Sequence, residues 1–151
     1  MIFKSITSCF NALTLNGMNI ALTSMPGDPL HPGHVSCLQS LRPTVDNWAV
    51  VNKIEPSSIA IVCVVNDDTF LVNKKGFAFM PLDDRMTMID NVKNGPDFVV
   101  PFHPSNRDDQ SVCEAISLMH PILFLKGGDR KADETLPEWN ICKEVGCTII
   151  D

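Results

Sequence analysis

The chain of 151 residues has no hydrophobic run long enough to cross a bilayer. Its longest uninterrupted apolar run, residues 59–65, is far shorter than the roughly 20 residues that a spanning helix needs. Serine, threonine and asparagine interrupt the N-terminal segment where a signal peptide needs an apolar centre. We therefore predict no membrane segment and no export, and expect a cytoplasmic protein.

Positive charge is also scarce, because 12 Lys and Arg face 18 Asp and Glu and the net charge is −6. This balance argues against a general surface for nucleic acid or for anionic membranes. A phosphate ligand must therefore meet a local basic cluster. The composition, 44% hydrophobic and 20% charged, is that of a soluble globule with one core.

None of the six cysteines forms a C-x-x-C pair. Some lie in apolar runs, as Cys63 does in "IAIVCVV", where a thiol behaves as a small buried hydrophobe. This usage favours a reducing compartment.

Short apolar runs alternate with amphipathic segments along the chain. We predict strands at residues 19–24, 58–67, 97–102, 122–128 and 148–151. Helices are predicted from residue 33 to a stop at Pro43, and at residues 81–92, 108–119 and 134–145. This alternation predicts an α/β fold with a Rossmann-like, doubly wound parallel sheet of five strands. For its strand order we expect 3-2-1-4-5, in which strands 1 and 4 are neighbours. Residues 44–57 exceed an ordinary connection and are either extra helix or an insertion that packs on a partner.

Two histidines lie three residues apart in "GDPLHPGH", directly after the first predicted strand. Ligands of a doubly wound sheet bind beyond the carboxyl ends of the strands, where the strand order reverses. The segments that leave strands 1 and 4 at that point are "PGDPLHPGH" and "KGGDR". Both therefore face one crevice.

His31 and His34 have two other interpretations, a surface pair or half of a metal site. A zinc site needs a further ligand at recognisable spacing, and none stands out. At a helix N-terminus the backbone N–H groups favour an anion, and two imidazoles add donors. We therefore favour a role in handling phosphate.

Basic residues close to this crevice could supply the local positive charge. Lys74 and Lys75 lie in a predicted loop, where lysines are usually only solvated. Arg85 is placed near the positive end of its helix, where a cation is disfavoured unless an anion holds it. Lys126 follows a strand, Gly127-Gly128 lets the backbone approach a ligand closely, and Arg130 is near.

Three acidic residues of the same region remain ambiguous. Asp67, Asp68 and Asp129 could hold Mg²⁺ through water or contact ribose hydroxyls. Aspartate is equally a common turn residue. Both interpretations stay open.

The ordered motifs "LHPGH", "VVNDD", Lys75-Gly76, "PLDDRM", "DFVVPF" and "LKGGD" resemble the cytidylyltransferase-like nucleotidyltransferase superfamily, marked by H-x-G-H. Within it they are most similar to the adenylyltransferase domain that activates D-glycero-β-D-manno-heptose 1-phosphate. The resemblance covers about residues 19–151. It divides the chain into an N-terminal extension, residues 1–17, and a nucleotidyltransferase domain, residues 18–151.

The resemblance implies transfer of a nucleoside monophosphate to a phosphorylated small molecule such as a sugar 1-phosphate, with release of pyrophosphate. ATP is favoured over CTP, Mg²⁺ accompanies the triphosphate, and no covalent enzyme intermediate forms. The implied catalytic residues are His31, His34, Lys75 and Arg85, and the implied nucleotide-binding residues are Met25, Gly27, Asp28, Gly33, Lys126, Gly128 and Asp129. The protein ligands of a metal are not identified.

Two alternatives remain, a cytidylyltransferase for a polyol or amino-alcohol phosphate, and a nucleotide-binding module that has lost turnover. Pro26 lacks an N–H that could meet phosphate, and the sequence stops at Asp151 before the Ser/Thr segment that caps the phosphates in relatives. We expect a neighbouring subunit of a homodimer, or residues 44–57, to provide that cover.

Overall fold

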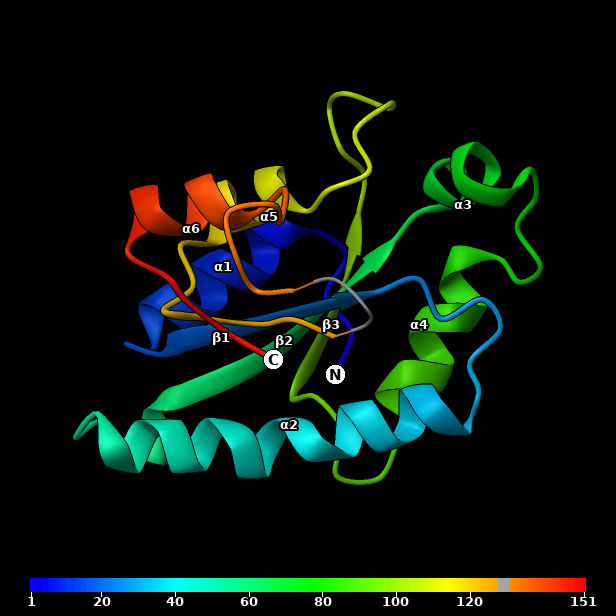
Figure 1. Cartoon of the computed structure of the whole chain (residues 1–151). Coiled ribbons are helices and arrows are strands. Elements are labelled where there is room, and N and C mark those ends of the chain that lie inside the picture. Colours follow the sequence, from blue (N-terminus) through cyan, green and yellow to red (C-terminus); the bar gives the residue numbers. More distant parts are fainter. Residues whose placement is uncertain (128–130) are drawn as a thin grey trace.

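The computed structural model describes residues 1–127 and 131–151. A parallel five-stranded sheet in the order β3-β2-β1-β4-β5 forms the centre, which confirms the predicted fold (Figure 1). The strands are β1 (Asn19–Met25), β2 (Ile59–Asn66), β3 (Phe98–Phe102), β4 (Leu123–Leu125) and β5 (Thr148–Ile150). The described residues include no helix long and apolar enough to cross a membrane.

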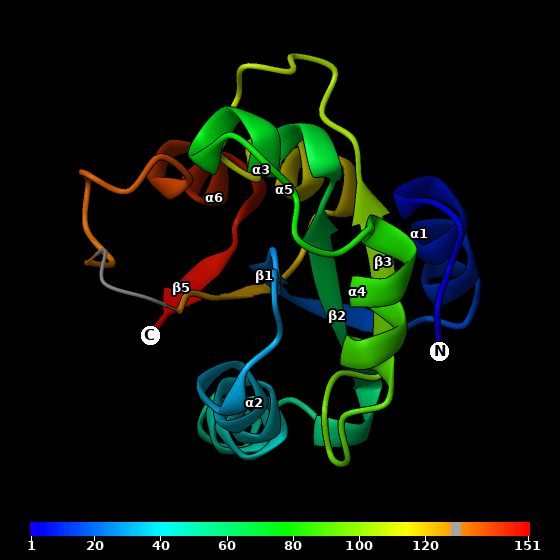
Figure 2. The ribbon, with the colours of Figure 1, turned by 90° about the vertical axis from the view of Figure 1, so that its right-hand side faces the viewer.

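Side chains of the sheet are buried on both faces, as the uninterrupted apolarity of β2 predicts. Alternate residues of β2 enter two different apolar clusters, because successive side chains of a strand point to opposite faces. Helices α1 (Ile6–Leu15), α5 (Cys113–Met119) and α6 (Trp139–Val145) contribute to one cluster, and α2 (Pro32–Val51) and α4 (Leu82–Asp90) to the other. Figure 2 looks onto the edge formed by the carboxyl ends of the strands.

The predicted stop at Pro43 is wrong, because α2 continues through it to Val51. Proline removes one hydrogen bond from the helix ladder. On both sides of it, Leu41 and Val45 are buried against the sheet, and this burial holds the helix together. Most of the segment that the sequence left unplaced is therefore the second half of α2.

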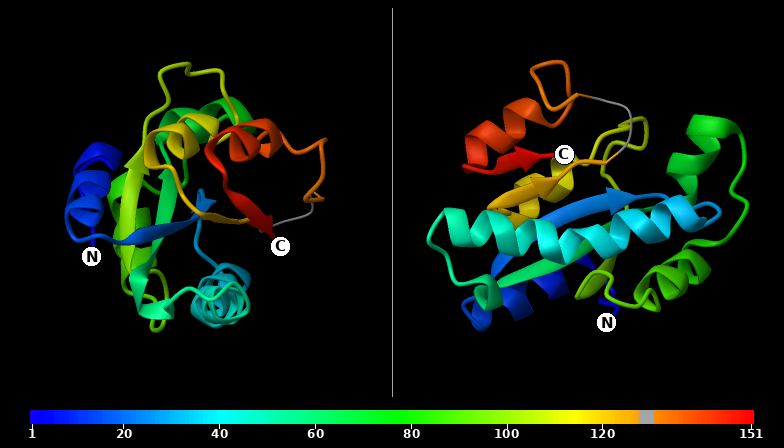
Figure 3. Two further views of the ribbon diagram at one scale, coloured as in Figure 1. Left: turned by 90° about the vertical axis from the view of Figure 1, so that its left-hand side faces the viewer. Right: turned by 60° about the horizontal axis from the view of Figure 1, so that its bottom comes forward.

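Residues 44–57 do not cover the crevice, contrary to our expectation. Helix α2 begins at the carboxyl edge of the sheet and runs back against the strand direction (Figure 3). Its last turns and the short 3-10 helix η1 (Pro56–Ser58) therefore lie at the opposite edge, directly before β2. This geometry excludes the segment as a cover for bound phosphates.

Lys74 and Lys75 end a helix, α3 (Asp68–Lys75), where we predicted a loop. The Asp67 carboxylate caps its N-terminus by accepting a hydrogen bond from the Phe70 N–H at 2.9 Å. Gly76 ends it with a positive φ of 88°. Lysines in a last turn also suit the helix dipole. Two of the other predicted helices begin about five residues later than expected, α5 at Cys113 and α6 at Trp139.

Helix α1, within the predicted extension of residues 1–17, packs on the sheet. Ile6, Cys9 and Leu13 are buried in the same cluster as α5 and α6, and Ile2 forms a parallel bridge to Val99. Whether these residues are dispensable for nucleotide binding stays a prediction.

We expect Leu13→Ala to lower the free energy of unfolding by about 2–5 kcal/mol, because the side chain is 4% exposed and its loss leaves a cavity. Urea denaturation measures the change. Leu15→Ala is the matched control, since Leu15 is 90% exposed on the same helix. Equal effects of the two substitutions would show that α1 does not belong to the core.

Candidate functional site

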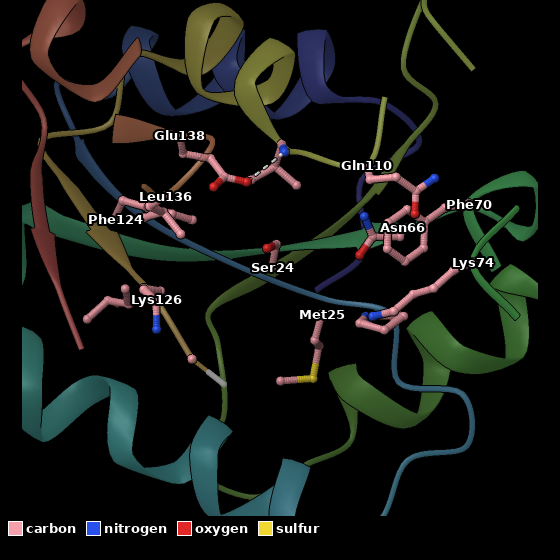
Figure 4. A pocket seen from close by; sticks show the side chains of 14 residues that line it. Ser24, Met25, Asn66, Phe70, Lys74, Gln110, Phe124, Lys126, Leu136 and Glu138 are labelled. Carbon is pink, nitrogen blue, oxygen red and sulfur yellow. Dashed lines mark hydrogen bonds between the residues drawn. The ribbon is translucent and has the colours of Figure 1, made fainter. Parts of the chain in front are cut away.

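A pocket of about 460 Å³ opens at the carboxyl ends of β1, β2 and β4. It therefore lies where the strand order reverses, between β1 and β4. Its lining comprises Ser24, Met25, Pro26, Asn66, Phe70, Lys74, Gln110, Val112, Phe124, Leu125, Lys126, Gly127, Leu136 and Glu138 (Figure 4).

Two lysines bring positive charge to this pocket. Lys74 reaches into it from the last turn of α3 (Figure 4). Lys126 follows β4, and its side chain is 5% exposed, with Nζ 3.2 Å from Oδ1 of Asp151. The acidic protein thus has a local basic site at the predicted crevice.

The two histidines of "HPGH" form a reciprocal cap at the N-terminus of α2. Nδ1 of His31 accepts hydrogen bonds from the N–H groups of Gly33, at 3.1 Å, and His34, at 3.4 Å. Nδ1 of His34 accepts from the N–H of His31 at 3.3 Å. The rings stack with centroids 3.7 Å apart and planes inclined by 21°.

This cap determines which ring nitrogen carries the proton. Because each Nδ1 accepts, the proton of each neutral ring belongs on Nε2. Burial and the neighbouring His31 lower the pKa of His34, while the Pro29 backbone has the opposite effect, so His34 is neutral near pH 7. We expected the backbone N–H groups of Gly33 and His34 to bind an anion. They donate to the ring of His31 instead. The His34 ring also donates to the Pro29 backbone, so the motif bonds largely to itself.

Gly33 is required by the ring of His31. A Cβ at this position would lie 2.9 Å from Cε1 and 3.0 Å from Nδ1 of that ring. Any side chain here would push the His31 ring out of its capping position. The glycine of H-x-G-H therefore makes room for the capping imidazole.

Lys75 and Asp28 connect two loops at the rim. Nζ of Lys75 is 2.8 Å from Oδ2 of Asp28, whose side chain is 1% exposed. The Asp28 carboxylate also accepts from the N–H groups of Phe79 and Met80, at 2.7 and 2.6 Å. Burial alone would raise the pKa of Asp28, but Lys75 and these two donors outweigh it and the pKa is lowered. The pair holds the loop after Gly27, whose φ is 61°, against the loop after α3.

Arg85 is a second connector, with no exposed side-chain surface. It donates to the carbonyl oxygens of Met80 at 2.9 Å, and of Pro26 and Asn66 at 2.7 Å each. Its NH2 group donates to Oδ1 of Asp68 at 2.6 Å. We expected an anion to hold Arg85 near the N-terminus of α4. That anion is the carboxylate of Asp68.

The structure brings only part of the predicted set to the pocket. Met25 and Lys126 line it, whereas the lining does not include His31, His34, Gly27, Asp28, Gly33, Lys75 or Arg85. Gly128 and Asp129 lie outside the described residues. The pocket is also lined by Glu138, Gln110 and Ser24, which the sequence did not predict because no local pattern marks them. Asn66 was predictable, because it ends strand β2 in "VVNDD" at the carboxyl edge of the sheet.

The described residues include no group of three or more His, Cys, Asp or Glu side chains that could hold a metal ion. Asp67 caps α3 and lies 3.0 Å from Nδ1 of His103, and Asp68 pairs with Arg85. These carboxylates already have protein partners and do not form a ready magnesium site. A role for Mg²⁺ stays a prediction.

No protein-family model matches the chain. It is 31% identical over 120 residues to the bifunctional protein HldE of Yersinia enterocolitica, over 78% of this chain and 21% of that protein. The bifunctional protein HldE of Gluconacetobacter diazotrophicus is 26% identical over 122 residues, 80% of this chain and 21% of that protein. The chain thus spans about a fifth of the length of these relatives.

A solved structure has the same fold. It is the crystal structure of the lipopolysaccharide core biosynthesis protein from Thermoplasma volcanium, with a TM-score of 0.63 and 21% identity, covering 88% of this chain and 93% of that one. The matches in sequence and fold agree with the resemblance inferred from the motifs.

Proposed function

From this resemblance to the cytidylyltransferase-like nucleotidyltransferase superfamily, we propose that the protein is a nucleotidyltransferase of the sugar-phosphate type. It transfers AMP from ATP to a phosphorylated small molecule, such as a sugar 1-phosphate, and releases pyrophosphate. The observation that supports this most is the pocket at the strand-order reversal, which Lys74 and Lys126 line.

In this reaction an oxygen of the acceptor phosphate attacks the α-phosphorus of the nucleotide in line. A new P–O bond forms as the bond to the leaving pyrophosphate breaks, so the enzyme forms no covalent intermediate. The protein contributes positioning and stabilisation of developing negative charge. The Nε2–H groups of His31 and His34 would donate to phosphate oxygens, and the two lysines would offset the charge of the triphosphate. Mg²⁺ is proposed to enter with the nucleotide.

A cytidylyltransferase for a polyol or amino-alcohol phosphate would use the same chemistry. A nucleotide-binding module without turnover is the alternative outside enzymes. The geometry of "HPGH" favours catalysis, because two rings held in one tautomer suit donors that act on a reacting phosphate, for which a pure binder has little use. A cytoplasmic homodimer is part of the proposal, and sedimentation tests its stoichiometry.

The test is release of pyrophosphate from ATP and from CTP across a panel of phosphorylated acceptors. Release that depends on one acceptor supports the proposal and identifies both substrates. Binding of ATP without release in any combination would contradict it and favour the binding module.

We predict that Lys74→Ala weakens ATP binding by about 10- to 100-fold without changing stability, as expected for one charged hydrogen bond of about 1.5–3 kcal/mol. Lys75→Ala should instead lower the melting temperature, because it leaves the buried carboxylate of Asp28 without its cation. Calorimetric titration and thermal unfolding separate the two effects. If Lys75→Ala loses affinity for ATP at unchanged stability, Lys75 binds the triphosphate, as the resemblance implied.

A further inference from the structure

Glu138 is a buried carboxylate in a pocket that is proposed to bind an anion. It is 8% exposed, and its Oε1 accepts a hydrogen bond from the N–H of Val112 at 3.1 Å. Figure 4 shows its carboxylate across the pocket from the ammonium groups of Lys74 and Lys126. The bond from Val112 uses one carboxylate oxygen, and the carboxylate has further lone pairs that can accept from a ligand in the pocket.

The charges give the pocket two unlike sides. A triphosphate is attracted to Lys74 and repelled by Glu138, whereas Lys126 already pairs with the carboxylate of Asp151. This arrangement favours a nucleoside that extends toward Glu138. Apolar side chains of Val112, Phe124 and Leu136 also line the pocket, and the faces of a base require such contacts.

We propose that Glu138 selects the nucleotide by accepting a hydrogen bond from the exocyclic amino group of its base. This inference rests on the proposed function and deepens it. A base that carries an amino group at this position, such as adenine, gives the carboxylate a donor, whereas hypoxanthine presents a carbonyl oxygen to it. A buried acceptor rejects an analogue without the donor strongly, because its own group is then left unpaired. The ribose hydroxyls are the other possible donors, and the experiment separates them from the base.

The test is titration of the full chain with ATP, ITP and 2′-deoxy-ATP. Wild type should bind ATP at least tenfold more tightly than ITP and should bind 2′-deoxy-ATP nearly as well as ATP. Equal affinities for ATP and ITP would overturn the proposal without any variant. Discrimination against 2′-deoxy-ATP alone would overturn it in favour of the ribose.

Glu138→Gln keeps a carbonyl oxygen for the Val112 N–H and turns an amide donor toward the ligand. The ratio of the dissociation constants for ITP and ATP should fall at least tenfold in this variant. Glu114→Gln is the matched control, because Glu114 also accepts a backbone N–H, from Ser105 at 2.7 Å, but does not line this pocket. An unchanged ratio in folded Glu138→Gln would overturn the inference and leave the proposed function standing. Failure of wild type to bind any of the three nucleotides would instead overturn the proposed function.

Discussion

Replacing His34 by alanine should lower the rate of pyrophosphate release by about 10²- to 10³-fold, the usual loss when one well-placed donor to a developing negative charge is removed, about 3–4 kcal/mol. The reason is the proposed donation from the His34 imidazole to a phosphate oxygen, for which the ring would exchange its hydrogen bond with the Pro29 backbone. Steady-state release with the acceptor found in the substrate panel measures the effect.

The cap itself must be separated from this role, since its loss alone costs about 0.5–2 kcal/mol of stability. His34→Gln restores a capping side chain at the third position of the helix but lacks the imidazole. Both variants should therefore release pyrophosphate slowly, while only the alanine variant loses stability. His103→Ala is the control for a histidine at the same edge, since His103 contacts Asp67 and lies outside the motif. Pyrophosphate release at the wild-type rate in His34→Ala would end the catalytic interpretation.

The largest effect on stability is expected from Arg85→Met, which should lower the free energy of unfolding by about 3–5 kcal/mol. The substitution keeps the apolar stem and removes a fully buried guanidinium that donates to three carbonyl oxygens and to Asp68. The three carbonyl oxygens would lose this donor, whereas Asp68 is 50% exposed and can turn to water. Chemical denaturation measures the loss.

Arg42→Met is the matched control, because Arg42 pairs with Asp46 and Asp97 but is 32% exposed. A partly solvated pair of this kind contributes about 0–1 kcal/mol. If Arg85→Met keeps wild-type stability and loses affinity for ATP, Arg85 holds phosphate as the resemblance implied. Loss of stability in both variants to the same extent would contradict the role of Arg85 as the buried connector.

The sequence determined the sheet and the position of the histidine turn. The β-branched run of β2 and the shorter apolar runs of β1 and β3 are local patterns, and parallel crossovers leave few ways to order such strands. The cap at "HPGH" is local as well, since its hydrogen bonds join residues two or three apart. Such features can be predicted from the sequence because the residues that interact are close together in it.

Only the tertiary structure decided what each cation contacts. Lys74 and Lys75 are adjacent, but neighbouring helical residues point about 100° apart. Burial of Leu71 and the cap at Asp67 fix the rotation of α3 about its axis. As a result Lys74 points into the pocket, and Lys75 forms its ion pair with Asp28.

Distance along the chain explains what the sequence left undetermined. The contact of Lys75 with Asp28 joins residues 47 apart, and that of Glu138 with Val112 joins residues 26 apart. Helix α2 likewise passes Pro43 because the sheet beneath it buries Leu41 and Val45. Local propensity cannot encode such partners, since their free energy arises only when distant segments pack and exclude water.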